Sequence, residues 1–167
     1  MSGLDLSPPM AEPRPLVVLQ SAEFRKGREA AWRDLERLID LSHRVEFGGM
    51  PAHRHPYVRE KLAQLSIETR ALRLARYRAL SAMRNQAPGP ESSFGKLLAT
   101  EINLRLALFA DELLGAYNGL APGSAGAIDG GRWSQKLIGA RALTIAAGSS
   151  EIQHNIIGER VLGLPKD

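Results

Sequence analysis

The C-terminal stretch Arg141-Ala-Leu-Thr-Ile-Ala-Ala-Gly-Ser-Ser-Glu-Ile-Gln-His-Asn-Ile-Ile-Gly-Glu-Arg-Val-Leu-Gly-Leu-Pro165 is the most informative part of this sequence. It predicts a helix from Ser149 to Leu162, since Ser149 or Ser150 is a favourable N-cap residue. Apolar side chains recur along this helix at spacings of one and four residues, and we expect them to form its buried stripe. They are Ile152, Ile156 and Ile157.

Three long amphipathic helices are predicted upstream of this stretch. The first begins after about Leu16 and ends near Gly48-Gly49, because paired glycines do not extend a helix cheaply. The second begins at Pro56, and the third begins at Glu91. The apolar faces at helical spacing are Trp32, Leu35 and Ile39 in the first helix, Val58, Leu62, Leu65, Thr69 and Leu72 in the second, and Phe94, Leu98, Ile102, Leu106, Phe109 and Leu113 in the third.

The remaining segments connect these helices or lie at the N-terminus. Residues 115–131 contain six glycines and are predicted to be a loop, followed by a short helix over residues 133–143. The proline-rich residues 1–15 are predicted to be a disordered tail. The only strand-like run is Leu16–Leu19, which is too short to separate from a helix start. The sequence therefore predicts an all-α protein, with one antiparallel helical bundle over residues 16–167.

Composition narrows the class of protein. A length of 167 residues suits one domain with a substantial core. The chain has no cysteine, which excludes disulfides and cysteine-bound metals, and it has no apolar run long enough to span a bilayer, so we expect a soluble cytoplasmic protein. The net charge of +4 suits an anionic small molecule, but arginines interleaved with glutamates and few aromatic residues argue against nucleic acid.

The stretch Thr144-Ile-Ala-Ala-Gly-Ser-Ser-Glu-Ile-Gln-His-Asn-Ile-Ile-Gly-Glu-Arg-Val-Leu-Gly163 resembles the C-terminal signature of the acyl-CoA dehydrogenases. A shorter element, Arg44-Val-Glu-Phe-Gly48, resembles a family motif that contacts a flavin dinucleotide held largely by a neighbouring subunit. The resemblance covers roughly residues 23–165 and implies the fold of that family's C-terminal helical domain. Family members are more than twice this long, and their other two domains complete the flavin and acyl-CoA sites.

This resemblance implies candidate residues for an FAD site. Arg44 and Phe47 would contact the flavin of a neighbour, and Ser149, Ser150 and Glu151 would contact flavin phosphate or ring atoms at a helix N-terminus. The same three residues are also typical of an ordinary helix cap, which needs no ligand. The partial turn Leu114-Gly115-Ala116 matches the family's Leu-Gly-Gly turn only in part.

The resemblance also questions the activity. Many relatives carry the catalytic glutamate just before the Gly-Ser-Ser turn, where this chain has Ala147. Some place the base on an earlier helix, and the nearest analogue here is Glu23, although a carboxylate near a helix start is more often a partner of the helix dipole. His43, His53 and His55 could suggest a metal, but no acidic residue lies beside them to complete a tetrahedral set, and we predict no metal site.

Three functions remain open at this point. The first is a truncated dehydrogenase-like subunit that acts on acyl thioesters when a separate chain completes the flavin site. The second is a non-catalytic oligomerisation or assembly module. The third is a stand-alone domain repurposed for non-redox chemistry, such as cyclisation or isomerisation of a hydrophobic substrate. Under each we expect an oligomer or a partner, because an isolated copy of this domain would expose apolar surface.

Overall fold

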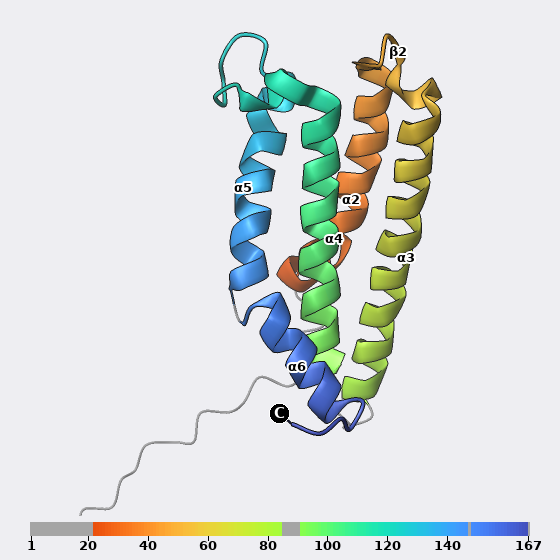
Figure 1. The fold of residues 1–167 in the computed structure, drawn as a ribbon, viewed down its shortest axis with the longest axis vertical. Helices are drawn as coiled ribbons and strands as arrows, with labels where there is room; N and C mark the ends of the chain where they lie inside the picture. The colour runs from red at the N-terminus through yellow and green to blue at the C-terminus, as the bar shows by residue number, and fades with distance from the viewer. Residues whose placement is uncertain (1–21, 85–90, 147, 167) are drawn as a thin grey trace, which may run out of the picture.

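The computed structural model describes residues 22–84, 91–146 and 148–166, with side chains over 29–81, 94–146 and 148–166. The predicted tail over residues 1–15, the strand candidate Leu16–Leu19 and Ala147 lie outside the described residues. Four helices run alternately up and down in Figure 1, and a shorter fifth helix packs across one end. They are α2 (Ala22–Arg44), α3 (Pro56–Arg84), α4 (Glu91–Leu114), α5 (Arg132–Ile145) and α6 (Ser150–Arg160). The predicted all-α antiparallel bundle is confirmed.

The connection between α2 and α3 contains a small hairpin that the sequence pattern did not predict. Strands β1 (Glu46–Phe47) and β2 (Met50–Pro51) pair antiparallel, and a 3-10 turn, η1 (Ala52–Arg54), leads into α3. Gly48 and Gly49 form the turn with φ of +59° and +79°, a conformation that costs glycine little. Helix α2 therefore ends at Arg44, four residues before the predicted end, because the chain turns into this hairpin.

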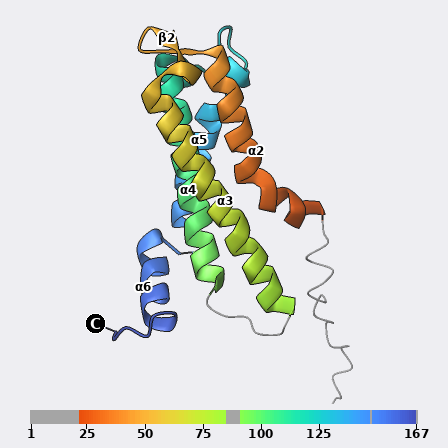
Figure 2. The same ribbon diagram turned by 90° about the vertical axis from the view of Figure 1, so that its right-hand side faces the viewer.

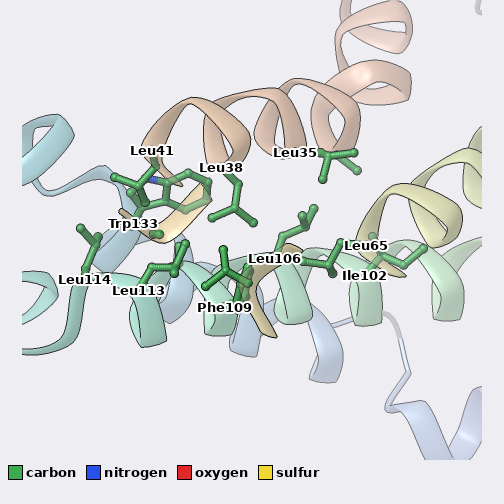
Figure 3. Close-up of a cluster of buried hydrophobic side chains, with 14 of the residues drawn as sticks. Leu35, Leu38, Leu41, Leu65, Ile102, Leu106, Phe109, Leu113, Leu114 and Trp133 are labelled. Carbon is green, nitrogen blue, oxygen red and sulfur yellow. The ribbon is translucent and has the colours of Figure 1, made fainter. Parts of the chain in front are cut away.

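The core lies around α4, which packs against all four other helices. Figure 3 shows leucines of α2 facing α4 together with Trp133 of α5. Trp133 is fully buried, and an aromatic side chain of this size is a major part of the burial energy. Other buried members are Leu35, Leu38, Leu41, Leu65, Leu72, Ile102, Leu106, Phe109, Leu113 and Leu114. The predicted apolar faces of α3 and of the second half of α4 are confirmed.

Three residues predicted to be buried are not. Ile39 is 38% exposed, because α2 presents Leu38 and Leu41 to the core instead. Phe94 is 47% exposed at the start of α4, where the bundle opens. Ile152 is 53% exposed, because α6 packs mainly on α4 and buries Gln153 rather than the predicted stripe. Ile156 and Ile157 are half-buried.

The glycine-rich segment between α4 and α5 is ordered by two short 3-10 turns, η2 (Gly115–Gly119) and η3 (Ile128–Gly131). Gly131 has φ of +77°, and a Cβ there would lie 2.9 Å from the Cα of Pro122. A larger residue would therefore push the loop away from the bundle. Among the described helices, none combines the length and apolar character needed to cross a bilayer.

Candidate functional site

Arg44 lies at the end of α2, where three segments of the chain meet. Its Nε donates to Oδ2 of Asp40 at 2.9 Å, and its Nη2 donates to Oδ1 and Oδ2 of Asp129 at 2.9 and 3.2 Å. Asp129 adopts a left-handed conformation with φ of 52°, and its Oδ2 also accepts from Nε1 of buried Trp133 at 3.1 Å. The glycine-rich loop thus fixes the orientation of Arg44.

The charge on Arg44 is secured by these contacts. Burial is the largest single influence and opposes the charged form, but the hydrogen bonds and charges of Asp129 and Asp40 together outweigh it and raise the pKa of Arg44. Its side chain is still 44% exposed. Arg44 is therefore a fixed cation with a face toward solvent, although an incoming phosphate would compete with two carboxylates.

Phe47 is held by aromatic neighbours on the hairpin and α3. Its ring stacks on Tyr57 with centroids 5.9 Å apart and meets His55 edge-on at 5.0 Å. Tyr57 in turn meets the buried Phe109 at 6.4 Å. Phe47 is half-buried against the core cluster. Part of this residue therefore stays exposed to solvent, close in the chain to Arg44 at the C-terminal end of α2.

Of the three histidines near the hairpin, two stack on each other and the third lies against Phe47. His43 and His53 stack with ring centroids 4.3 Å apart. The Nδ1 atoms of His53 and His55 are buried without a hydrogen-bond partner among the described residues. Within the described ranges, no group of three or more His, Asp or Glu side chains is placed to hold a metal ion.

The second predicted cluster lies at the start of α6, which is capped locally. Ser149 is the N-cap, and its Oγ accepts from the N–H of Ile152 at 3.5 Å, as the sequence predicts. The preceding Gly148 has φ of +94°, and a Cβ there would lie 2.8 Å from Nε2 of Gln153. Lys96 of α4 donates to the carbonyl oxygens of Gly148 at 2.5 Å and Thr144 at 3.3 Å. This lysine fixes the turn that presents Ser149.

Glu151 occupies the positive end of α6. Hydrogen bonds from Ser149 and from its own backbone N–H lower the pKa of its exposed carboxyl group. A carboxylate at a helix N-terminus is the favourable arrangement. The Glu151 carboxylate already accepts hydrogen bonds from donors at the start of α6 that an anionic ligand would need. The start of α6 therefore suits the neutral polar atoms of a flavin ring better than a phosphate.

The two clusters lie at opposite ends of the bundle. In Figure 1 the hairpin and the 115–131 loop are at one end, and α6 is at the other. Helix α5 of 14 residues joins the two ends, which corresponds to about 21 Å at 1.5 Å per residue. The two candidate clusters therefore do not form one site within a single copy of this chain. Toward a flavin dinucleotide, Arg44 offers a guanidinium group, and Ser149 and Ser150 offer hydroxyl groups.

The two candidate base positions remain predictions. Glu23 lies in the first turn of α2, and its side chain is outside the described side chains. Ala147, which the sequence places at the family's usual glutamate position, falls outside the described residues.

A buried ion cluster ties α2, α4 and α5 together between the two ends. Asp34 is 4% exposed and accepts from Nζ of Lys136 at 2.6 Å and from Nη2 of Arg132 at 3.2 Å. Arg37 contacts the same carboxylate at 3.2 Å, and Lys136 also donates to Oδ1 of Asn103 at 3.3 Å. Burial alone would raise the pKa of Asp34, but its bonds to Lys136 and Arg132 lower it overall.

Sequence reasoning missed Asp129, Lys96 and Asp34, the residues that position the candidate site. Asp129 lies in the glycine-rich segment that was predicted only as a loop, although an aspartate before paired glycines is a recognisable turn signal. Lys96 and Asp34 act through contacts with residues 48 to 102 positions away in the chain, and no local pattern marks such pairs.

Comparison with known proteins agrees with the signature described above. The family model for the acyl-CoA dehydrogenase C-terminal domain matches residues 28–162. Acyl-CoA dehydrogenase IpdE1 of Mycobacterium tuberculosis is 33% identical over 152 residues, which cover 90% of this chain and 38% of the relative. The protein of the same name from Mycolicibacterium smegmatis is 35% identical, and the match covers 90% of this chain and 37% of the relative. The chain thus spans somewhat more than one third of these curated relatives.

Solved structures give the same fold. A chain in the ChsE4-ChsE5 complex from Mycobacterium tuberculosis has a TM-score of 0.72 at 25% identity, over 84% of this chain and 37% of that chain. The glutaryl-coenzyme A dehydrogenase glutaryl-CoA complex has a TM-score of 0.64 at 24% identity, over 84% of this chain and 34% of that chain. The second likeness concerns the fold alone. Because the family model covers most of the sequence and the curated relatives agree with it, this chain belongs to the acyl-CoA dehydrogenase family and corresponds to its C-terminal helical domain.

Proposed function

We propose that this chain is the helical subunit of an FAD-dependent acyl-thioester dehydrogenase whose flavin site is completed by another chain. The observation that carries the proposal is the placement of the two candidate clusters, Arg44 with Phe47 and Ser149 with Ser150, at opposite ends of one bundle. Each cluster offers only a few side-chain groups among the described residues, and we infer that protein from elsewhere is needed to hold a dinucleotide.

Two further observations support a partner. One solved structure with the same fold is that of a complex between ChsE4 and ChsE5. In addition, α5 exposes Ile138 and Ile145, each 72% accessible. Apolar side chains exposed to this degree along one helix favour an interface with a partner chain or a second copy.

The chain's own residues have distinct tasks under this proposal. Arg44, held by Asp129, binds an anionic part of the cofactor of a neighbouring subunit, and Phe47 packs beside it. Ser149 and Ser150 orient neutral polar atoms at the start of α6. When bound, FAD supplies the acceptor for the hydride that leaves the β-carbon of the acyl thioester. Glu23 is the candidate that removes the α-proton, and its carboxyl group would hold that proton.

A second function, a non-catalytic assembly module, is favoured by one specific observation. The sequence has alanine at position 147, and a methyl group cannot accept a proton. In that case the bundle supports the partner and the partner carries out the chemistry. The lack of cysteine fits the reducing cytoplasm, where we expect either form to work.

A visible absorption spectrum tests these alternatives. The chain is purified alone and after co-expression with an acyl-CoA dehydrogenase-like chain encoded beside it. A yellow complex that releases FAD on denaturation and oxidises an acyl thioester supports the dehydrogenase, and loss of turnover in Glu23→Gln with flavin retained assigns the base. A colourless complex supports the assembly module. A colourless chain that converts a ligand alone refutes both and favours the non-redox alternative.

A further inference from the structure

A recess lies between the C-terminal half of α3 and the end of α6, apart from Arg44 and from Ser149. Its volume is about 670 Å³, compared with about 330 Å³ and 300 Å³ for two other recesses lined by described residues. In Figure 2, α6 and α3 lie on different sides of the start of α4. Its apolar lining comes from all three helices and consists of Leu74, Ala75, Phe94, Ile157 and Val161.

The exposure of this lining is high for side chains of this kind. Leu74 is 68% exposed, and Phe94 and Val161 are 47% and 48% exposed. Covering such surface is favourable by about 25 cal/mol per Å² of apolar area removed from water. The recess therefore offers an apolar surface that a ligand of matching shape can cover.

Two arginines complete the lining of the recess. Arg78 of α3 and Arg160 of α6 lie on the two facing helices, and both are exposed. Among the described residues no carboxylate lies within ion-pair distance of either guanidinium. Guanidinium groups bind carboxylates in a two-pronged geometry, and an unmatched pair at one recess favours an anionic head group.

We propose that this recess binds an amphipathic organic carboxylate, with its hydrocarbon body on the α3–α4–α6 surface and its carboxylate between Arg78 and Arg160. A volume of about 670 Å³ with an apolar lining and a few polar groups is typical of small-molecule sites. The site is separate from the two candidate clusters. Along α6 alone, Arg160 lies 11 residues from Ser149, or about 16 Å at 1.5 Å per residue.

Two other recesses lined by described residues do not fit this class of ligand. In the recess of about 330 Å³ between α3 and α4, Lys61 and Arg105 balance the charges of Glu68 and Glu112. In the recess of about 300 Å³ between α2 and α3, Arg33 and Arg73 likewise balance the charges of Glu29 and Glu36. Of these three recesses, the one between α3 and α6 has an excess of positive charge in its lining.

Calorimetric titration of the purified chain with sodium decanoate, below its micelle concentration, tests the proposal. We expect one decanoate per chain and at least tenfold weaker binding of decanamide, which has the same hydrocarbon body without the charge. Arg78→Gln and Arg160→Gln should each weaken decanoate binding about tenfold, because each removes a charged hydrogen bond. Leu74→Gln should weaken both probes.

Arg59→Gln is the matched control, since it makes the same change on an exposed residue at the other end of α3. It should leave decanoate binding unchanged. Equal affinity for the two probes, no effect of the Arg78 and Arg160 variants, or no binding at all would overturn the proposal. So would sedimentation showing that Leu74→Gln dissociates an oligomer while decanoate does not bind, since protein would then cover the recess. The titration needs no flavin, so its outcome is independent of the proposed dehydrogenase function.

Discussion

Replacing Asp34 by asparagine tests how the bundle holds together between its two ends. The Asp34 side chain is 6% exposed and meets Lys136, Arg132 and Arg37 at 2.6, 3.2 and 3.2 Å. Asparagine keeps the shape and one acceptor oxygen but removes the charge that these three cations share. The change therefore isolates the electrostatic part of the contact between α2 and α5.

The expected loss of stability in Asp34→Asn depends on how well water can solvate each cation once the carboxylate charge is gone. Arg132 and Arg37 are 45% and 46% exposed and rehydrate readily, whereas Lys136 is 17% exposed and would keep its charge in a confined place, with the neutral Asn103 and the new asparagine as neighbours. Breaking a fully buried pair costs about 3–5 kcal/mol, so with one confined cation we expect about 3 kcal/mol in the free energy of unfolding. For a domain of this size this lowers Tm by roughly 6–12 °C.

The effect has a predictable pH dependence. The folded-state pKa of Asp34 is lowered, so its contribution is fully present above the unfolded-state pKa of about 4 and is lost as pH falls through the lower folded-state value. The difference between the wild-type chain and Asp34→Asn should be constant near neutral pH and should shrink in acid.

Urea denaturation followed by far-UV circular dichroism at pH 7 and in acid measures both effects. Asp40→Asn is the control on the same helix, because the Asp40 side chain is 69% exposed and its pair with Arg44 should contribute less than about 1 kcal/mol. The reasoning is refuted if the two variants lose the same stability at pH 7, or if the loss in Asp34→Asn grows as pH falls.

Three other changes test the remaining contacts. Gly148→Ala should destabilise the docking of α6 by about 1–3 kcal/mol, because φ of +94° strains alanine and its Cβ would meet Gln153; faster amide hydrogen exchange in α6 alone is the expected signature, and uniform exchange would contradict it. Trp133→Leu should cost about 2–4 kcal/mol through a core cavity and a lost bond to Asp129, measured by thermal denaturation, and a loss below about 1 kcal/mol would show that the core collapses to fill the space. Lys96→Met should free the Gly148 carbonyl and lower flavin retention in the completed enzyme while leaving global stability within about 1 kcal/mol, measured by released FAD; unchanged retention would contradict its positioning role.

The sequence predicted the parts of this fold that depend on local pattern. Pro56 and Glu91 begin α3 and α4 as expected, because a proline at a first turn and a break by two prolines are local signals. Ser149 caps α6 for the same reason. The bundle itself followed from the regular apolar spacing of α3 and α4.

Other features depend on tertiary contacts and were missed or placed wrongly. The two-residue strands at the hairpin are too short to show any alternation. The exposure of Ile152 depends on which helices α6 packs against, which its own spacing does not encode. The roles of Lys96 and Asp129 depend on partners far along the chain. The roles of Arg44, Phe47, Ser149, Ser150, Glu151 and Glu23 toward a flavin or substrate stay predictions.

The ion pair between Arg44 and Asp129 limits where this domain can accept inserted residues. Asp129 and Trp133 are four positions apart and share a hydrogen bond across the left-handed residues that lead into α5, so their spacing is fixed. One residue inserted between them would move the carboxylate of Asp129 away from Arg44. An insertion near Gly123, where a Cβ would meet nothing within 4 Å, leaves that register intact. Homologous chains that keep this ion pair should therefore vary in length on the Pro122 side of the loop and stay constant from Ile128 to Trp133.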